Sequence, residues 1–155
     1  MIATRRDVVK VTGVFALLAA IGMLTPKQAR AQQLAWNKAA FESKTLPEVV
    51  KSLGGATAAE SKDITITSPD IAENGAVVPV GVTSKIPNTQ SVYILVEKNP
   101  NALAAGFHIP AGTEPTVSTR VKMAQTSNVM AIVKADGKFY VANKEIKVTL
   151  GGCGG

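Results

Sequence analysis

The spacing of apolar residues changes once along the chain, from a helical period to an alternating one. Between residues 32 and 55, the segments LAWNKAAFESK and TLPEVVKSLGG place apolar side chains among good helix formers. Thr45 and Glu48 have the spacing of a capping box, Pro47 falls in the first turn, and Gly54 follows as a stop. The pattern predicts one helix and then a short second one. The side chains that we expect to turn inward are Trp36, Phe41, Leu46, Val49 and Leu53. An amphipathic helix that docks a partner is the alternative interpretation of this segment.

From residue 63 onward, apolar and polar residues alternate, which is typical of half-buried β-strands. The strand-like segments are DITITS, GAVVPVGVTS, SVYILVEK, EPTVSTRVKMAQTS and NVMAIVKADGKFYVANKEIKVTL. Turn residues separate the first three (PDIAENG and IPNTQ), and KNPNALAAGFHIPAG interrupts the strands after them. Asp136-Gly137 divides the last run and predicts a tight hairpin, because both central residues of such a turn need positive φ. Pro79 inside a valine run predicts an edge strand or a bulge, and KEIKVTL at residues 144–150 predicts a half-buried final strand.

These strands predict the fold class. Roughly six or seven short strands, with a turn about every ten residues, indicate a mainly β chain: an immunoglobulin-like antiparallel β-sandwich without the usual cysteine pair. Its 155 residues, 46% of them hydrophobic and 18% charged, suit a single core. We expect the sandwich to span residues 56–150, after a helical segment at residues 32–55 and before a flexible arm at residues 151–155.

The first 31 residues have the pattern of an export signal. A charged start, MIATRRDVVK, is followed by the apolar run VTGVFALLAAIGML and by ARA, which fits a signal peptidase site before Gln32. Arg5 and Arg6 look like the paired arginines of a twin-arginine signal. An ordinary secretory signal or an uncleaved anchor is the alternative. The apolar run is short for a membrane span, so we expect an exported protein without a stable membrane anchor.

Removing this leader changes the charge balance. Residues 1–31 hold five of the 17 Lys and Arg residues and one of the 11 acidic residues. The remaining chain has 12 basic and 10 acidic residues, a formal net charge of +2 rather than +6. Because no basic stripe interleaved with aromatic residues remains, the sequence does not support a nucleic-acid partner.

The single cysteine, Cys153, lies in the C-terminal sequence KVTLGGCGG. An odd cysteine in an exported chain indicates either an intermolecular disulfide or a thiol kept for use. Its neighbours Gly151, Gly152, Gly154 and Gly155 adopt left- and right-handed conformations almost equally, which predicts a flexible arm. Extended, the three residues from Leu150 to Cys153 span about 10 Å. The tail is therefore suited to presenting a thiol to the active site of another protein.

The sequence contains no recognisable catalytic constellation of its own. His108 is the only histidine, and no acidic or thiol partner lies at metal-ligand spacing from it. A packed or hydrogen-bonded side chain is the expectation for it. The terminal carboxylate beyond Gly155 disfavours a thiolate at Cys153, so we expect the thiol to be activated by the protein that receives the arm. We expect no catalytic residue, metal site or cofactor in this chain.

The leader, the short helical start, the β-sandwich and the terminal GGCGG together resemble the SoxY family, the sulfur-carrier subunits of the periplasmic Sox thiosulfate-oxidation system. The resemblance implies a carrier rather than an enzyme, with Cys153 as the covalent attachment point for thiosulfate and later sulfur intermediates. It implies a heterodimer with a SoxZ-like subunit. It also implies heme- and metal-containing partner enzymes of the SoxXA, SoxB and SoxCD types, which act on the group borne by the swinging arm.

Two other functions compete with the carrier. One is an exported immunoglobulin-like structural or interaction module whose terminal cysteine forms an intermolecular disulfide. The other is a redox enzyme with Cys153 as nucleophile, which is the weaker alternative because no general base or resolving cysteine accompanies the thiol.

Overall fold

A computed structural model describes residues 37–149 of the chain. Two short helices come first, α2 (Lys38–Glu42) and α3 (Leu46–Ser52), as the apolar pattern predicts. The side chain of Asn37 caps α2 by accepting a hydrogen bond from the Ala40 N–H at 3.1 Å. The predicted inward residue Trp36 lies outside the described residues.

The predicted capping box is present at the start of α3. The Glu48 N–H donates to Thr45 Oγ1 at 3.4 Å, and the Thr45 N–H donates to Glu48 Oε2 at 3.2 Å. The Lys44 N–H donates to the same carboxylate oxygen at 2.8 Å, and this bond is the largest cause of a lowered pKa at Glu48. The carboxylate therefore satisfies backbone donors that the first turn of a helix leaves free.

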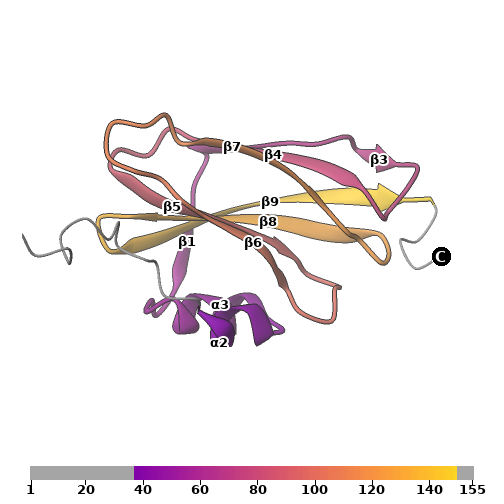
Figure 1. The fold of residues 1–155 in the computed structure, drawn as a ribbon, viewed down its shortest axis with the longest axis horizontal. Coiled ribbons are helices and arrows are strands. Elements are labelled where there is room, and N and C mark those ends of the chain that lie inside the picture. Colours follow the sequence, from indigo (N-terminus) through magenta and orange to yellow (C-terminus); the bar gives the residue numbers. More distant parts are fainter. Residues whose placement is uncertain (1–36, 150–155) are drawn as a thin grey trace, which may run out of the picture. The chain divides into compact units, whose positions relative to one another are not determined.

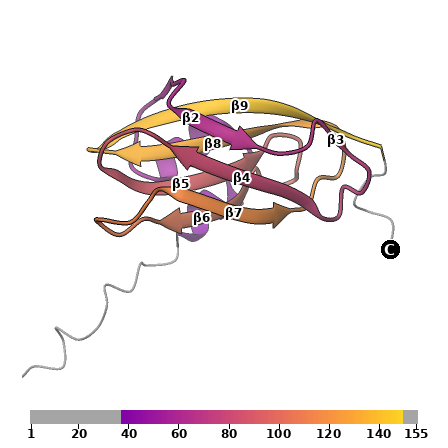
Figure 2. The same ribbon diagram turned by 90° about the horizontal axis from the view of Figure 1, so that it is seen from above.

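Nine strands follow within residues 37–149, so the fold is mainly β as predicted. Their bounds are β1 Ala58–Glu60, β2 Ile64–Thr67, β3 Ile71–Ala72, β4 Val78–Ser84, β5 Thr89–Val96, β6 Leu103–His108, β7 Thr116–Val121, β8 Ser127–Ala135 and β9 Lys138–Val148. The larger sheet has the order β1-β9-β8-β5-β6, with β3 also paired to β9, and the smaller sheet has the order β2-β4-β7. Figure 1 shows the two sheets face to face, and Figure 2 shows β4 between β2 and β7.

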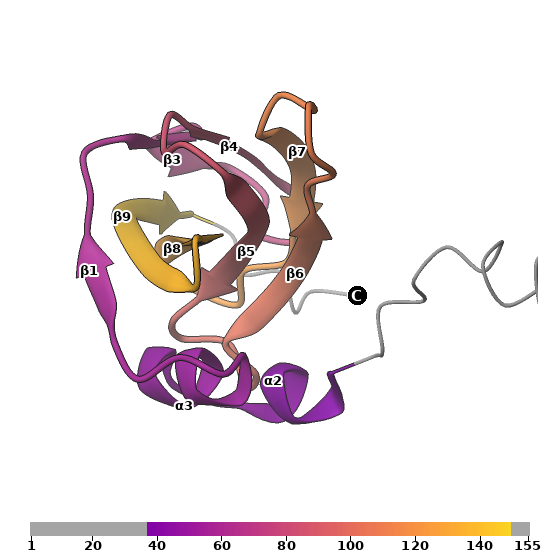
Figure 3. The ribbon, with the colours of Figure 1, turned by 90° about the vertical axis from the view of Figure 1, so that its left-hand side faces the viewer.

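The central strand β8 of the larger sheet is buried on both faces. Val129, Ala131 and Val133 belong to the core between the two sheets. Met130 and Ile132 belong to a second core, in which the sheet packs against the helices. The helices cover this outer face of the larger sheet in Figure 3. Burial on both faces explains why β8 reads as a continuous apolar run rather than an alternating one.

The helical side chains predicted to point inward take part in this second core. Val49 is fully buried, and Phe41, Leu46 and Leu53 are partly buried against the cluster. These side chains therefore pack, fully or in part, on the chain's own larger sheet. The described part of the chain contains no helix with the length and apolar character needed to cross a membrane.

Three strands were not expected from the sequence. β6 lies within KNPNALAAGFHIPAG, a segment predicted to interrupt the strands, where alanines and a glycine give little β-propensity. β1 and β3 lie in segments predicted to be a linker and a turn, and both pair with β9 in parallel. The sandwich is therefore mixed rather than purely antiparallel.

Pro79 does not mark an edge strand, because β4 is the middle strand of the smaller sheet. β2 pairs only with the second part of β4, from Gly81 to Ser84. At Pro79 the strand has a neighbour on one side only, with Arg120 of β7 opposite. The missing N–H of the proline is tolerated at this position because the backbone is locally at an edge.

The hairpin predicted at Asp136-Gly137 is confirmed. Asp136 has φ 47° and Gly137 has φ 74°, and Ala135 pairs with Lys138 across the turn. Two consecutive positive φ values are the requirement of the tight turn that connects strands of right-handed twist. The hairpin sets the register of the long strand β9, which leads to the C-terminal tail.

Candidate functional site

The end of β9 is the last part of the body before the C-terminal tail. We call residues 147–149 the arm root. Thr149 is the last described residue, and Cys153 is four positions further along the chain. Ile146, immediately before the arm root, is fully buried in the core between the sheets. The body therefore holds the chain firmly up to this point.

Backbone hydrogen bonds fix the arm root to the segment around β3. Ile71 pairs with Lys147, and Ala72 pairs with Val148. The Lys147 N–H donates to the Asp70 carbonyl at 2.9 Å, and the Thr149 N–H donates to the Ala72 carbonyl at 3.1 Å. The short parallel strand β3 thus orients the last residues of β9 (Figure 1).

Side chains add further links to the arm root. Thr149 Oγ1 donates to the Glu73 carbonyl at 3.2 Å. From the opposite side, Thr126 Oγ1 accepts a hydrogen bond from the Val148 N–H at 2.9 Å. Lys144 Nζ lies 2.9 Å from Asp70 Oδ1 and donates to the Ser68 carbonyl at 2.7 Å. Because the Asp70 side chain is 88% exposed, its ion pair contributes little stability. These contacts mainly hold the β3 segment in place beside β9.

The other chemical candidate, His108, lies on β6 within the described part of the chain. It is exposed at the end of β6, opposite Ser91, so the packed form of the expected packed or hydrogen-bonded side chain is wrong. Side chains alternate along β6, so Ala105 and Phe107 pack against the core between the sheets while His108 lies on the exposed face. Among residues 37–149 no group of three His, Cys, Asp or Glu side chains is arranged to hold a metal ion.

The predicted site residues themselves lie outside the described residues. This applies to Cys153, to the arm glycines Gly151, Gly152, Gly154 and Gly155, and to Arg5 and Arg6 of the leader. Their roles stay predictions. The structure adds the β3 segment, which sequence reasoning assigned to a turn. A two-residue strand has no periodic signal, so only its pairing with β9 reveals it.

A match to a protein-family model shows which family this chain belongs to. A family model described as "Sulfur oxidation protein SoxY" matches residues 50–153. The chain belongs to the SoxY family. The matched range covers the described strands and extends to Cys153.

One solved structure supports the SoxY assignment. The sulfur carrier protein SoxY from Chlorobium limicola f thiosulfatophilum is 39% identical, with a TM-score of 0.60, over 66% of this chain and 93% of that one. A superoxide reductase (neelaredoxin) from Ignicoccus hospitalis also matches, at 21% identity and a TM-score of 0.46, over 55% of this chain and 79% of that one. No curated protein matches the chain. The SoxY matches support a sulfur-carrier role in sulfur oxidation, and the predicted family is confirmed.

Proposed function

We propose that this chain is a periplasmic sulfur carrier that holds thiosulfate-derived intermediates on the thiol of Cys153. The observation that carries the proposal is the SoxY family match, which extends to Cys153. A 39% identical protein that is itself a sulfur carrier supports it. These matches favour the carrier over a structural module crosslinked through its cysteine.

The proposed loading step is an oxidative conjugation. Cys153 loses its thiol proton, and its Sγ forms a bond to the outer sulfur of thiosulfate. The product is a cysteine S-thiosulfonate, and the two electrons released pass to a heme-containing conjugating enzyme. The carrier supplies the attachment point and supplies no catalytic group. In this scheme Gly151, Gly152, Gly154 and Gly155 give the arm reach and clearance inside a narrow channel.

The proposed partners and location follow from the resemblance together with the leader. Arg5 and Arg6 support export by a twin-arginine signal to the periplasm. There the chain pairs with a SoxZ-like subunit and presents its arm in turn to enzymes of the SoxXA, SoxB and SoxCD types. The fixed arm root supports this scheme, because it gives every enzyme the same starting point for the tether.

The loading step is tested by mass spectrometry. The mature chain with its partner subunit is incubated with thiosulfate, the conjugating enzyme and an electron acceptor. We expect the mass of one thiosulfonate group on the peptide that contains Cys153. The variant Cys153→Ser should gain no mass, because a hydroxyl does not form the sulfur–sulfur bond.

Two results would contradict the proposal. An equal mass gain in the Cys153→Ser variant would place the attachment elsewhere. A uniform disulfide-linked homodimer on non-reducing electrophoresis of periplasmic material, without sulfur adducts, would favour the structural module. The chain incubated with thiosulfate but without the enzyme is the control for spontaneous reaction.

A further inference from the structure

The short tether limits which part of the body a receiving enzyme approaches. Four residues lead from Thr149 to Cys153, so the two Cα atoms are separated by at most about 13–14 Å. When an enzyme draws the thiol into a recessed active site, most of the tether lies inside the channel that leads to it. The rim of its channel must then come close to the residues around the arm root. This step rests on the proposed function of Cys153.

Two exposed apolar side chains lie in the segment that holds the arm root. Ile71 is 56% exposed and Val77 is 52% exposed, and they are the large hydrophobic side chains that stand out on the surface of residues 37–149. Ile71 is in register with Lys147 of the arm root. Val77 follows the loop after β3, where its N–H donates to the Asn74 carbonyl at 3.4 Å.

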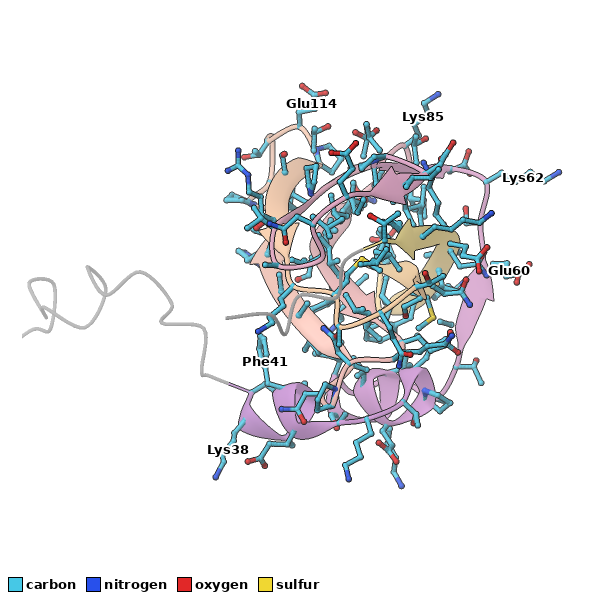
Figure 4. The ribbon with its side chains drawn as sticks, turned by 90° about the vertical axis from the view of Figure 1, so that its right-hand side faces the viewer. Lys38, Phe41, Glu60, Lys62, Lys85 and Glu114 are labelled. Atoms are coloured by element: carbon cyan, nitrogen blue, oxygen red, sulfur yellow. The ribbon has the colours of Figure 1, made fainter. Side chains whose placement is uncertain are left out.

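Packing does not require either side chain to be apolar. The neighbours of these residues toward the core, Ala72 and Val78, are buried in the cluster between the sheets, whereas Ile71 and Val77 belong to neither core. The loop between them is held in place, since the Gly75 carbonyl accepts a hydrogen bond from the Met123 N–H at 2.7 Å. Figure 4 views the molecule from this end of the sandwich.

We propose that Ile71 and Val77, together with Thr149, form a docking surface for the enzymes that receive the Cys153 arm. The partner that fits this surface is an enzyme whose active-site channel opens on an apolar rim. Burying two half-exposed aliphatic side chains supplies a small apolar contact that favours association through the hydrophobic effect. A contact this small suits a carrier that must leave each enzyme after one reaction.

The test is steady-state kinetics with the loaded carrier, in complex with its partner subunit, as the substrate of each receiving enzyme. The double variant Ile71→Thr and Val77→Thr keeps β-branched side chains and removes apolar surface. We expect its KM to rise about tenfold with kcat nearly unchanged, because docking is weakened while the arm and thiol are intact. A matched control, Pro110→Ser and Ala111→Ser, changes exposed residues in the β6–β7 loop at the opposite end of the sandwich and should leave KM unchanged.

Several outcomes would overturn the docking surface. One is an unchanged KM for every receiving enzyme; another is an equal rise in the control. Dissociation of the partner subunit or a changed oligomeric state in sedimentation would assign the surface to a subunit interface instead. If the double variant does not fold, Val77→Thr alone is measured, with an expected rise of about threefold. The mass of the Cys153 adduct is recorded first, so failed loading counts against the proposed function and normal loading with unchanged KM counts against the docking surface.

Discussion

Individual side chains set where the elements of this protein begin. Thr45 and Glu48 exchange hydrogen bonds ahead of α3, and the Glu48 carboxylate also accepts from the Lys44 N–H. Hydrogen bonds to a carboxylate favour its charged form, which is why the pKa of Glu48 lies below its usual value. α3 packs on the larger sheet as part of the second core. By capping α3, the exposed Glu48 side chain therefore also supports this core.

The lowered pKa predicts how stability depends on pH. Since folding lowers the pKa of Glu48, its contribution is present above the ordinary value of 4.5 and is lost as the pH falls through the folded-state pKa. We expect Glu48→Gln to lose less stability than the original chain between about pH 6 and about pH 3. Glutamine keeps an oxygen for the capping box and does not ionise.

The measurement is the urea midpoint at several pH values in this range. Glu60→Gln is the matched control, because Glu60 lies exposed on β1 outside the capping box. Its pH profile should follow that of the original chain. Identical profiles for Glu48→Gln and the original chain would contradict a coupling between this carboxylate and folding.

The elements differ in how they are specified. The β8–β9 hairpin is encoded locally, since its turn needs residues that tolerate positive φ and the sequence supplies Asp136-Gly137 there. β6 depends instead on tertiary contacts. Its Ala105 and Phe107 pack against the core between the sheets, and the strand pairs with β5 although its alanines have little β-propensity. Sequence patterns therefore predict the hairpin well and miss the edge strand.

The hairpin turn predicts a stability difference between two glycines. Gly137→Ala should lower the free energy of unfolding by about 1–2 kcal/mol, because an alanine with φ 74° is strained although space is free around it. Gly81→Ala in β4 is the matched control, since an added Cβ there meets Thr67 Cβ at an ordinary 3.5 Å and the residue has no positive φ. Urea unfolding of both variants measures the difference. An equal loss of stability in the two would show that the turn conformation is not what Gly137 provides.

At the scale of the whole molecule, residues 37–149 form a support for the C-terminal tail. Two cores pack on opposite faces of the larger sheet, and β9 contributes side chains to both of them before it reaches the arm root. The buried Ile146 and the bonds from Thr149 to Ala72 and Glu73 place the start of the tail at a defined point on the body. In the proposed function, this fixed base serves recognition and the glycine-rich tail serves reach.

This division predicts that the arm and the body respond separately to mutation. Replacing Gly152 and Gly154 by valine should lower turnover of the loaded carrier, because branched side chains restrict the backbone and collide with the walls of a narrow channel. The thermal midpoint should not change, since these residues come after the last strand of the described body. The double alanine variant is the control with smaller side chains and should show a smaller loss. Turnover that is unchanged by valine would mean that the glycines do not provide clearance.

The sequence by itself determined the features that depend on neighbouring residues. Helix capping at Thr45, the hairpin at Asp136-Gly137, the alternating strands and the SoxY-like GGCGG tail all rest on short-range rules or on a local motif. Only the tertiary structure decided the pairing of β1 and β3 with β9, and the place of Pro79 in a middle strand. Strands of two or three residues form here because their backbone groups pair with N–H and C=O groups of the long strand β9. β9 lies far away from them in the sequence. For the same reason, the apolar side chains beside the arm root could be recognised only after β3 was placed against β9.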